Sequence, residues 1–327
     1  MCNFATTKTK NGNNRMITGR FAPSPTGRIH LGNVFSALLS WLSAKSKEGR
    51  WLLRIEDIDP QRSHMEYAKL LMDDLQWLGL AWDGEPVFQS QRSDIYEHYY
   101  QLLQQQGLTY PCYCTRADLL ATQAPHESDG RVVYPGTCRP KKVEGERLMV
   151  EGGELKVEGG RAAATRLMVA DEDVSFADGH YGIQSVNMAQ QVGDYIIRRK
   201  DGAWAYQLAV VVDDGLMGIN EVVRGRDLLL SSPQQISLSR ILGFTPPQFI
   251  HLPLLINEAG QRLSKRDKSL DMGVLRQQYT APEIIGRLAY YAGLLPDPQP
   301  IMPCQLLKVF SWDKVPHNDI TVIAGSW

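Results

Sequence analysis

The chain has 327 residues, of which 43% are apolar and 22% are charged, and its formal net charge is −1. This composition indicates a globular protein with a sizeable core, and it excludes a disordered chain or one that attracts nucleic acid through overall positive charge. No run of 18 apolar residues occurs, so no membrane span is expected.

The first 15 residues are polar and lack the apolar stretch of a secretory signal, so we expect a flexible N-terminal extension. Translation could begin at Met1 or at Met16, and the sequence leaves this open. Only five cysteines occur, too few for a disulfide scaffold in a chain of this size. We therefore expect a reducing, cytoplasmic location.

The first regular elements are a strand over 16–22 and a helix that starts at Leu31. Pro23 and Pro25 prevent the strand from continuing into a helix. Apolar residues then recur at helical spacing from Leu31 to Leu42. His30 therefore lies at a strand-to-helix junction, where free backbone N–H groups and the helix dipole favour an anion.

Strand and helix alternate again over the next 50 residues. A strand is predicted over 51–55, a helix up to about 78 and another over 93–106, with Gly79 and Gly107 as stops. Ser63 and Glu66 have the spacing of a capping box, and we favour a helix-capping role over Mg²⁺ binding for Asp57 and Asp59. The alternation predicts an α/β fold with a parallel sheet.

Residues 108–190 interrupt this rhythm and are interpreted as an insertion. They contain three of the five cysteines and a Gly- and Glu-rich stretch over 141–160, whose order the sequence leaves open. Strands are predicted again over 195–199, 222–224 and 250–255, with a hairpin turn at Asp201 and Gly202. From residue 270 the chain is predicted to be helical and then irregular.

Several motifs occur in a fixed order along the chain. They are Phe21-Ala-Pro-Ser-Pro-Thr-Gly27, His30-Leu-Gly-Asn33, Arg54-Ile-Glu-Asp-Ile-Asp59, Trp204 to Asp214, Val223-Arg-Gly-Arg-Asp227, His251-Leu-Pro-Leu-Leu255 and Arg262-Leu-Ser-Lys-Arg266. From about residue 20 to residue 268, the chain resembles the glutamyl-tRNA synthetases. His30-Leu-Gly-Asn33 and Arg262-Leu-Ser-Lys-Arg266 resemble the HIGH-like and KMSKS-like signatures of class I aminoacyl-tRNA synthetases.

The resemblance implies a Rossmann-like catalytic core that activates glutamate with ATP and Mg²⁺. The residues implied for glutamate binding are Arg20, Ser24, Glu56, Tyr206 and Arg224. Those implied for ATP are His30, Gly32, Asn33, Arg262, Ser264 and Lys265, with His30 and Lys265 in catalytic roles. Taken alone, each of these residues could instead be an ordinary surface or salt-bridge residue.

The chain departs from the family pattern at three positions. Asn33 replaces the second histidine of the HIGH-like motif, and Arg262 replaces a lysine with a planar cation. Val210 stands where full-length glutamyl enzymes carry an asparagine, which suggests a different or looser amino-acid pocket.

Only 61 residues follow Arg266, too few for the helical anticodon-binding region of a full glutamyl-tRNA synthetase. In this the chain resembles the glutamyl-Q tRNA(Asp) synthetases, which esterify glutamate to the queuosine base of tRNA(Asp). The alternatives are charging of the tRNA 3′ end, a catalytically silent RNA-binding paralogue, or a small-molecule nucleotidyltransferase.

The expected domain divisions are an extension over 1–15, core halves over 16–107 and 191–268, the insertion over 108–190 and a short helical region over 269–327. A monomer is expected.

The three cysteines of the insertion suggest one structural zinc ion. Cys112, Cys114 and Cys138 can supply three thiolates, and zinc takes four tetrahedral ligands. By resemblance the fourth ligand is Tyr134, whereas His126 is the chemical alternative. Buried free cysteines are the remaining interpretation.

Overall fold

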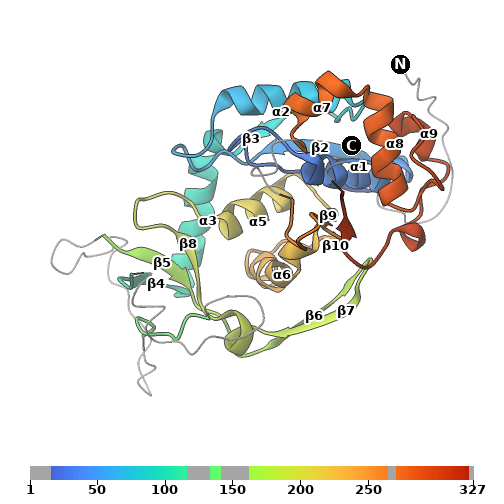
Figure 1. Cartoon of the computed structure of the whole chain (residues 1–327). Coiled ribbons are helices and arrows are strands. Elements are labelled where there is room, and N and C mark those ends of the chain that lie inside the picture. The colour runs from blue at the N-terminus through green and yellow to red at the C-terminus, as the bar shows by residue number, and fades with distance from the viewer. Residues whose placement is uncertain (1–15, 116–132, 141–161, 264–269, 324–327) are drawn as a thin grey trace.

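The computed structural model describes residues 16–115, 133–140, 162–263 and 270–323. Its centre is a parallel sheet with helices around it, which confirms the predicted α/β fold (Figure 1). β1 (Thr18–Phe21), β2 (Arg50–Ile55) and β3 (Val87–Phe88) pair in parallel, as do β9 (Glu221–Gly225) and β10 (Gln248–Leu252). β9 lies alongside β1, where the backbone N–H of Asn220 donates to the Thr18 carbonyl over 3.0 Å.

Helix α1 (Leu31–Lys45) crosses this sheet and contacts β1, β2 and β9. It begins at the predicted residue, and its side chains at helical spacing are all buried. Helices α2 (Met65–Trp77) and α3 (Ser93–Gln105) follow, and the glycines after them, Gly79 and Gly107, have positive φ angles of 79° and 67°. Glycine adopts this conformation without a steric penalty, so both predicted helix stops are confirmed.

The predicted capping box at the start of α2 is wrong. The N-cap residue is His64, and its side chain makes no capping hydrogen bond. The backbone N–H of Ser63 instead donates to the Asp59 carbonyl, 2.9 Å away. This turn places Ser63 ahead of the helix, so its hydroxyl is not in the capping position.

Two small antiparallel sheets contain the strands of the predicted insertion, and the strand that follows the insertion joins one of them. β4 (Thr109–Cys112) and β8 (Tyr195–Arg198) flank β5 (Ala164–Leu167), while β6 (Asp173–Asp178) and β7 (Gly182–Asn187) form a hairpin. Figure 1 shows this hairpin as a long arm that runs past α6 toward the C-terminal segment. The predicted hairpin at Gly202 is reduced to a single bridge between Arg198 and Trp204.

The remaining helices all come from the second half of the chain. They are α5 (Tyr206–Leu216), α6 (Ser232–Ile241), α7 (Met272–Gln278), α8 (Ala281–Tyr291) and α9 (Pro303–Leu306). A short pair, β11 (Leu255–Ile256) and β12 (Ile320–Thr321), joins the C-terminal segment to the core. Among the described helices, none is long and apolar enough to cross a membrane.

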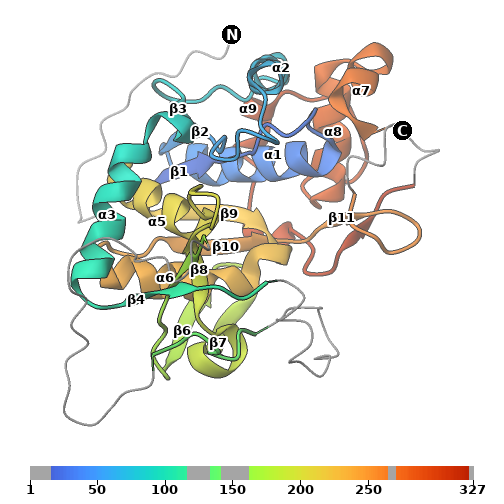
Figure 2. The same cartoon turned by 90° about the vertical axis from the view of Figure 1, so that its left-hand side faces the viewer.

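Two hydrophobic clusters build the core. One contains α1 with β1, β2, α2, α7 and α8, and the other contains α3, α5, α6 and β8. In Figure 2 the first cluster's helices α2, α7 and α8 lie at one end of the molecule, and the insertion strands β4, β6 and β7 lie at the opposite end. Side chains from both clusters reach the site described next.

Candidate functional site

A cavity of about 490 Å³ lies beyond the carboxyl ends of β1, β2 and β9, next to the start of α1. This is the usual ligand position in an open parallel α/β sheet, and the volume suits a small ligand. Every predicted site residue in the described part of the core lines it: Arg20, Ser24, His30, Gly32, Asn33, Glu56, Tyr206, Arg224 and Arg262. Ser264 and Lys265 lie outside the described residues.

His30 is fixed as the N-cap of α1. Its Nδ1 accepts from the Gly32 backbone N–H, 3.2 Å away, and its own backbone N–H donates to the Asn33 side-chain oxygen over 3.2 Å. Because Nδ1 is an acceptor, the neutral ring carries its proton on Nε2. The amide of Asn33 therefore completes the cap, which gives this departure from the family motif a structural role.

Arg224 is a buried cation at the cavity wall. Within the described part of the chain its guanidinium donates to four neutral acceptors: His251 Nε2 at 3.2 Å, Gln235 Oε1 at 2.8 Å, Ser232 Oγ at 2.8 Å and the Leu228 carbonyl at 3.3 Å. No carboxylate among the described residues forms an ion pair with it. Burial lowers the pKa of Arg224 although the charges of Asp214 and Glu56 oppose this, so its charge is only partly compensated. An anion in the cavity would compensate this charge.

A network of buried charges centred on Arg54 reaches the cavity through Arg20 and Glu56. This side chain is fully buried and bonds Asp214 at 2.6 Å and Glu56 at 3.3 Å. Asp214 also pairs with Arg20, 3.4 Å away. Burial raises the pKa of Glu56, whereas Arg54 and Arg20 hold the pKa of Asp214 below its usual value despite burial. The network places one carboxylate and one cation, Glu56 and Arg20, at the cavity.

Sequence reasoning named neither Arg54 nor Asp214 as site residues. Both occur inside the quoted motifs, and this was the signal that the sequence offered. Their function depends on contacts between residues 160 positions apart, which the order of motifs does not reveal.

Two expectations about individual residues are corrected. Asp57 accepts hydrogen bonds from the Ser90 backbone N–H and hydroxyl at 2.8 and 2.7 Å, and Asp59 pairs with Arg199 at 3.0 Å. Neither carboxylate caps α2, so the predicted capping role is wrong. Val210 is fully buried in the second hydrophobic cluster and does not line the cavity, so it does not shape the pocket surface directly.

Arg262 lies at the cavity's outer edge, where it forms an ion pair with Asp227. Both residues line the cavity, and Arg262 is more than half exposed. A second pair, between Arg226 and Asp319, lies next to it and fixes the C-terminal segment to the same turn.

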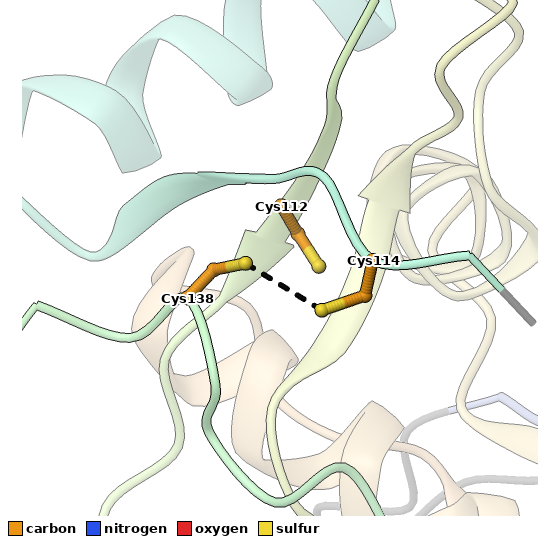
Figure 3. Close-up of side chains that lie close together, drawn as sticks. All are labelled: Cys112, Cys114 and Cys138. Carbon is orange, nitrogen blue, oxygen red and sulfur yellow. Dashed lines mark hydrogen bonds between the residues drawn. The ribbon is translucent and has the colours of Figure 1, made fainter. Parts of the chain in front are cut away.

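The three cysteines of the insertion converge at a distance from the cavity (Figure 3). The Sγ atoms of Cys112, Cys114 and Cys138 all lie within 4.8 Å of one another, and the last two are 3.6 Å apart. Zn–S bonds of about 2.3 Å in a tetrahedron require sulfur atoms roughly 3.8 Å apart. The cluster therefore has the size of a zinc site.

Tyr134 completes this cluster. Its hydroxyl lies 3.5 Å from Cys112 Sγ and 3.8 Å from Cys114 Sγ. Arg166 donates to Cys112 Sγ over 3.2 Å and stacks on the Tyr134 ring, so a cation lies beside the thiols. Although burial alone would raise it, the pKa of Cys112 is lowered by its hydrogen bonds with Tyr134 and Arg166. These residues fit a zinc ion, while His126 lies outside the described residues.

Comparison with known proteins gives consistent results. Residues 16–294 match the family model described as tRNA synthetases class I (E and Q), catalytic domain. The chain is 44% identical to the glutamyl-Q tRNA(Asp) synthetase of Nitratidesulfovibrio vulgaris and 41% identical to that of Neisseria meningitidis serogroup C. These matches cover 94% of the chain and 96% and 99% of the relatives.

The solved structures point the same way. A glutamate tRNA ligase from Elizabethkingia meningosepticum, in complex with its amino acid, superposes with a TM-score of 0.76 at 27% identity. The match covers 95% of this chain and 68% of that one. The ligase is thus similar in structure over nearly the whole of the present chain.

Proposed function

The chain belongs to the glutamyl-Q tRNA(Asp) synthetases within the class I (E and Q) synthetase family, and we propose that it activates L-glutamate with ATP and transfers the glutamyl group to the queuosine base of tRNA(Asp). The observation that carries the amino-acid part of this proposal is Arg224, a buried cation without a carboxylate partner among the described residues.

The cavity suits a dicarboxylic amino acid. Arg20 and Arg224 are two buried cations that line it, and Glu56 is a carboxylate on the same surface. Two carboxylates and one ammonium of glutamate complement these three charges. We assign Tyr206 and Ser24 to hydrogen bonds with the same substrate, because both line the cavity beside these groups.

ATP, as its Mg²⁺ complex, is proposed to bind at the start of α1. Gly32 leaves space there for a close approach to the backbone, and the Nε2–H of His30, on the cavity wall, is assigned to donate to a phosphate oxygen. The glutamate α-carboxylate attacks the α-phosphorus, a P–O bond forms, and the bond to the leaving pyrophosphate breaks. His30 stabilises the charge that develops, and Arg262, Ser264 and Lys265 are assigned to the departing phosphates.

The glutamyl group then passes from the adenylate to the acceptor. A hydroxyl of the queuosine ring attacks the activated carbonyl carbon, an ester bond forms, and AMP leaves with the electron pair of the broken bond. Zinc, held by Cys112, Cys114, Tyr134 and Cys138, is proposed to stabilise the fold of the insertion. We also propose that the protein acts as a monomer.

The test is glutamate acceptance by tRNA(Asp) with and without queuosine. Radiolabelled glutamate should be incorporated only into the queuosine-containing tRNA, after glutamate-dependent ATP–pyrophosphate exchange. Incorporation without queuosine would indicate charging of the 3′ end instead. Absence of glutamate-dependent exchange would indicate a catalytically silent protein.

A further inference from the structure

We propose that Asp178 and His251 act as a positioning pair that holds Arg224 in the orientation needed to receive a carboxylate of the substrate. This inference rests on the proposed glutamate pocket and adds two residues to it. Neither residue lines the cavity. Asp178 ends β6, in the insertion, and thereby connects the hairpin arm to the catalytic core.

The carboxylate of Asp178 is saturated with hydrogen bonds in a fully buried position. It accepts from the backbone N–H groups of His180 at 3.0 Å and Tyr181 at 2.9 Å, and from the backbone N–H of His251 at 3.2 Å. Its shortest contact is with His251 Nδ1, at 2.6 Å. These contacts fix both the hairpin turn and the imidazole ring.

The contact with Asp178 determines the tautomer of His251. An ionised carboxylate only accepts, so Nδ1 must carry the proton that it donates, and the lone pair of a neutral ring must then lie on Nε2. That lone pair faces Arg224 Nε at 3.2 Å and Ser232 Oγ at 3.2 Å. Burial lowers the pKa of His251, in agreement with a neutral ring beside a cation.

A neutral acceptor is the group that this position requires. A carboxylate next to Arg224 would fix the guanidinium but would also neutralise it and reduce its attraction for the substrate. His251 fixes the guanidinium through Nε and adds no negative charge of its own. The charge of Asp178 lies one imidazole ring away from Arg224. Its contact with Nδ1 ensures that the accepting nitrogen, Nε2, faces Arg224.

Two substitutions of His251 separate this role from a purely structural one. In His251→Asn the amide can reach the place of Nδ1 and keep a contact with Asp178, but nothing replaces Nε2. In His251→Gln the longer side chain can place its oxygen near Nε2 and accept from Arg224, while the contact with Asp178 is lost. Positioning of Arg224 therefore predicts that the Asn variant is the more impaired, whereas anchoring of the hairpin predicts the reverse.

The experiment measures glutamate-dependent ATP–pyrophosphate exchange by the full chain. We expect KM for glutamate to rise about tenfold or more in His251→Asn and clearly less in His251→Gln, with KM for ATP within about twofold of wild type in both. An equal or larger rise in His251→Gln, or a parallel rise of both KM values, would overturn the inference.

Asp178→Asn provides an independent measurement if the His251 variants do not fold. An asparagine can donate to Nδ1 and so allow the other tautomer, which would place an Nε2–H against the Arg224 Nε–H. KM for glutamate should again rise about tenfold at nearly constant KM for ATP, and an unchanged glutamate KM would refute the pair.

The matched control is Asp194→Asn, which removes a buried carboxylate with three hydrogen-bond donors that is remote from Arg224. It should leave both KM values unchanged. If the wild-type chain shows no glutamate-dependent exchange, the proposed function fails; if the wild type is active and the order of the variants is reversed, only the positioning role fails.

Discussion

His30 combines two roles that a single substitution can separate. Its Nδ1 caps α1, and its Nε2 carries the proton assigned to phosphate stabilisation. Asparagine is a good N-cap residue but has no donor at the Nε2 position. In His30→Asn we therefore expect the melting temperature to stay within about 2 °C of wild type, because asparagine keeps the cap, whose complete loss would cost about 1 kcal/mol.

The exchange rate of the same variant should fall by about 10²- to 10³-fold, the usual cost of removing one transition-state donor. Thermal melts and ATP–pyrophosphate exchange check the two halves of this prediction. His30→Ala is the comparison, since it loses the cap as well and should also melt lower. Wild-type exchange by His30→Asn would remove the catalytic assignment.

Arg54 supports the cavity from behind. It is fully buried among Glu56, Asp213 and Asp214, and their carboxylates keep its pKa above the usual value although burial opposes this. Arg54→Leu would leave these carboxylates buried together, so we expect the free energy of unfolding to fall by about 3–5 kcal/mol. Urea denaturation measures this change.

The control for Arg54 is Arg199→Leu, which removes a guanidinium that is 42% exposed and paired with Asp59 and Asp201. Surface ion pairs contribute little, so this variant should lose less than about 1 kcal/mol. Equal losses in the two variants would contradict the supporting role of Arg54.

Cavity-lining residues that belong to recognisable motifs could be named from the sequence, but their supporting partners could not. Arg20, His30, Glu56 and Arg224 were named because each has a recognisable place in a motif. Asp178 supports Arg224 from a hairpin whose register depends on tertiary packing, and no local pattern marks it. The capping prediction for Asp57 failed because a contact with Ser90, 33 residues away, replaced the local one.

At the level of elements, the core strands and α1 were predictable because their apolar patterns agree with their burial. The start of α2 was not, since the turn from Asp59 to Ser63 competes with helix formation. α6 (Ser232–Ile241) also went unrecognised, because its buried face is rich in serine and glutamine: Ser232, Gln235, Ser237 and Ser239 are all buried. Polar residues at core positions conceal the apolar period on which such predictions rely.

The cysteine cluster joins β4 to the segment that contains Tyr134 and Cys138. None of the residues in the cluster lines the cavity. Removal of zinc by a chelator under reducing conditions should therefore loosen the insertion locally. We expect faster amide hydrogen exchange in β4 and β5, with protection of α1 unchanged. Hydrogen-exchange mass spectrometry measures both regions.

Cys114→Ser should reproduce the chelator's effect and bind less zinc by metal analysis. Glutamate-dependent pyrophosphate exchange should persist in both cases, while transfer to tRNA falls if the insertion contacts the acceptor. Equal loss of protection in α1 and β4 would show that the metal supports the whole molecule instead of the insertion.

For the molecule as a whole, the cavity lies where the two hydrophobic clusters meet. His30 begins α1 of the first cluster, and Tyr206 begins α5 of the second. A ligand that contacts both clusters binds the folded chain only, so it should raise the stability of the entire fold. At a concentration 100 times Kd this linkage amounts to about 2.7 kcal/mol, which corresponds to a rise of several degrees in melting temperature.

Differential scanning calorimetry should thus show a higher melting temperature with glutamate and, separately, with ATP and Mg²⁺. Arg224→Ala should abolish the shift caused by glutamate and keep the shift caused by ATP, because Arg224 is assigned to the amino acid alone. The variant itself should fold, since the neutral partners of Arg224 keep other contacts, such as the bond between Gln235 and Gln207. If glutamate still stabilised Arg224→Ala as it does the wild type, the amino acid would have to bind elsewhere, and the charge complementarity proposed for this cavity would be incorrect.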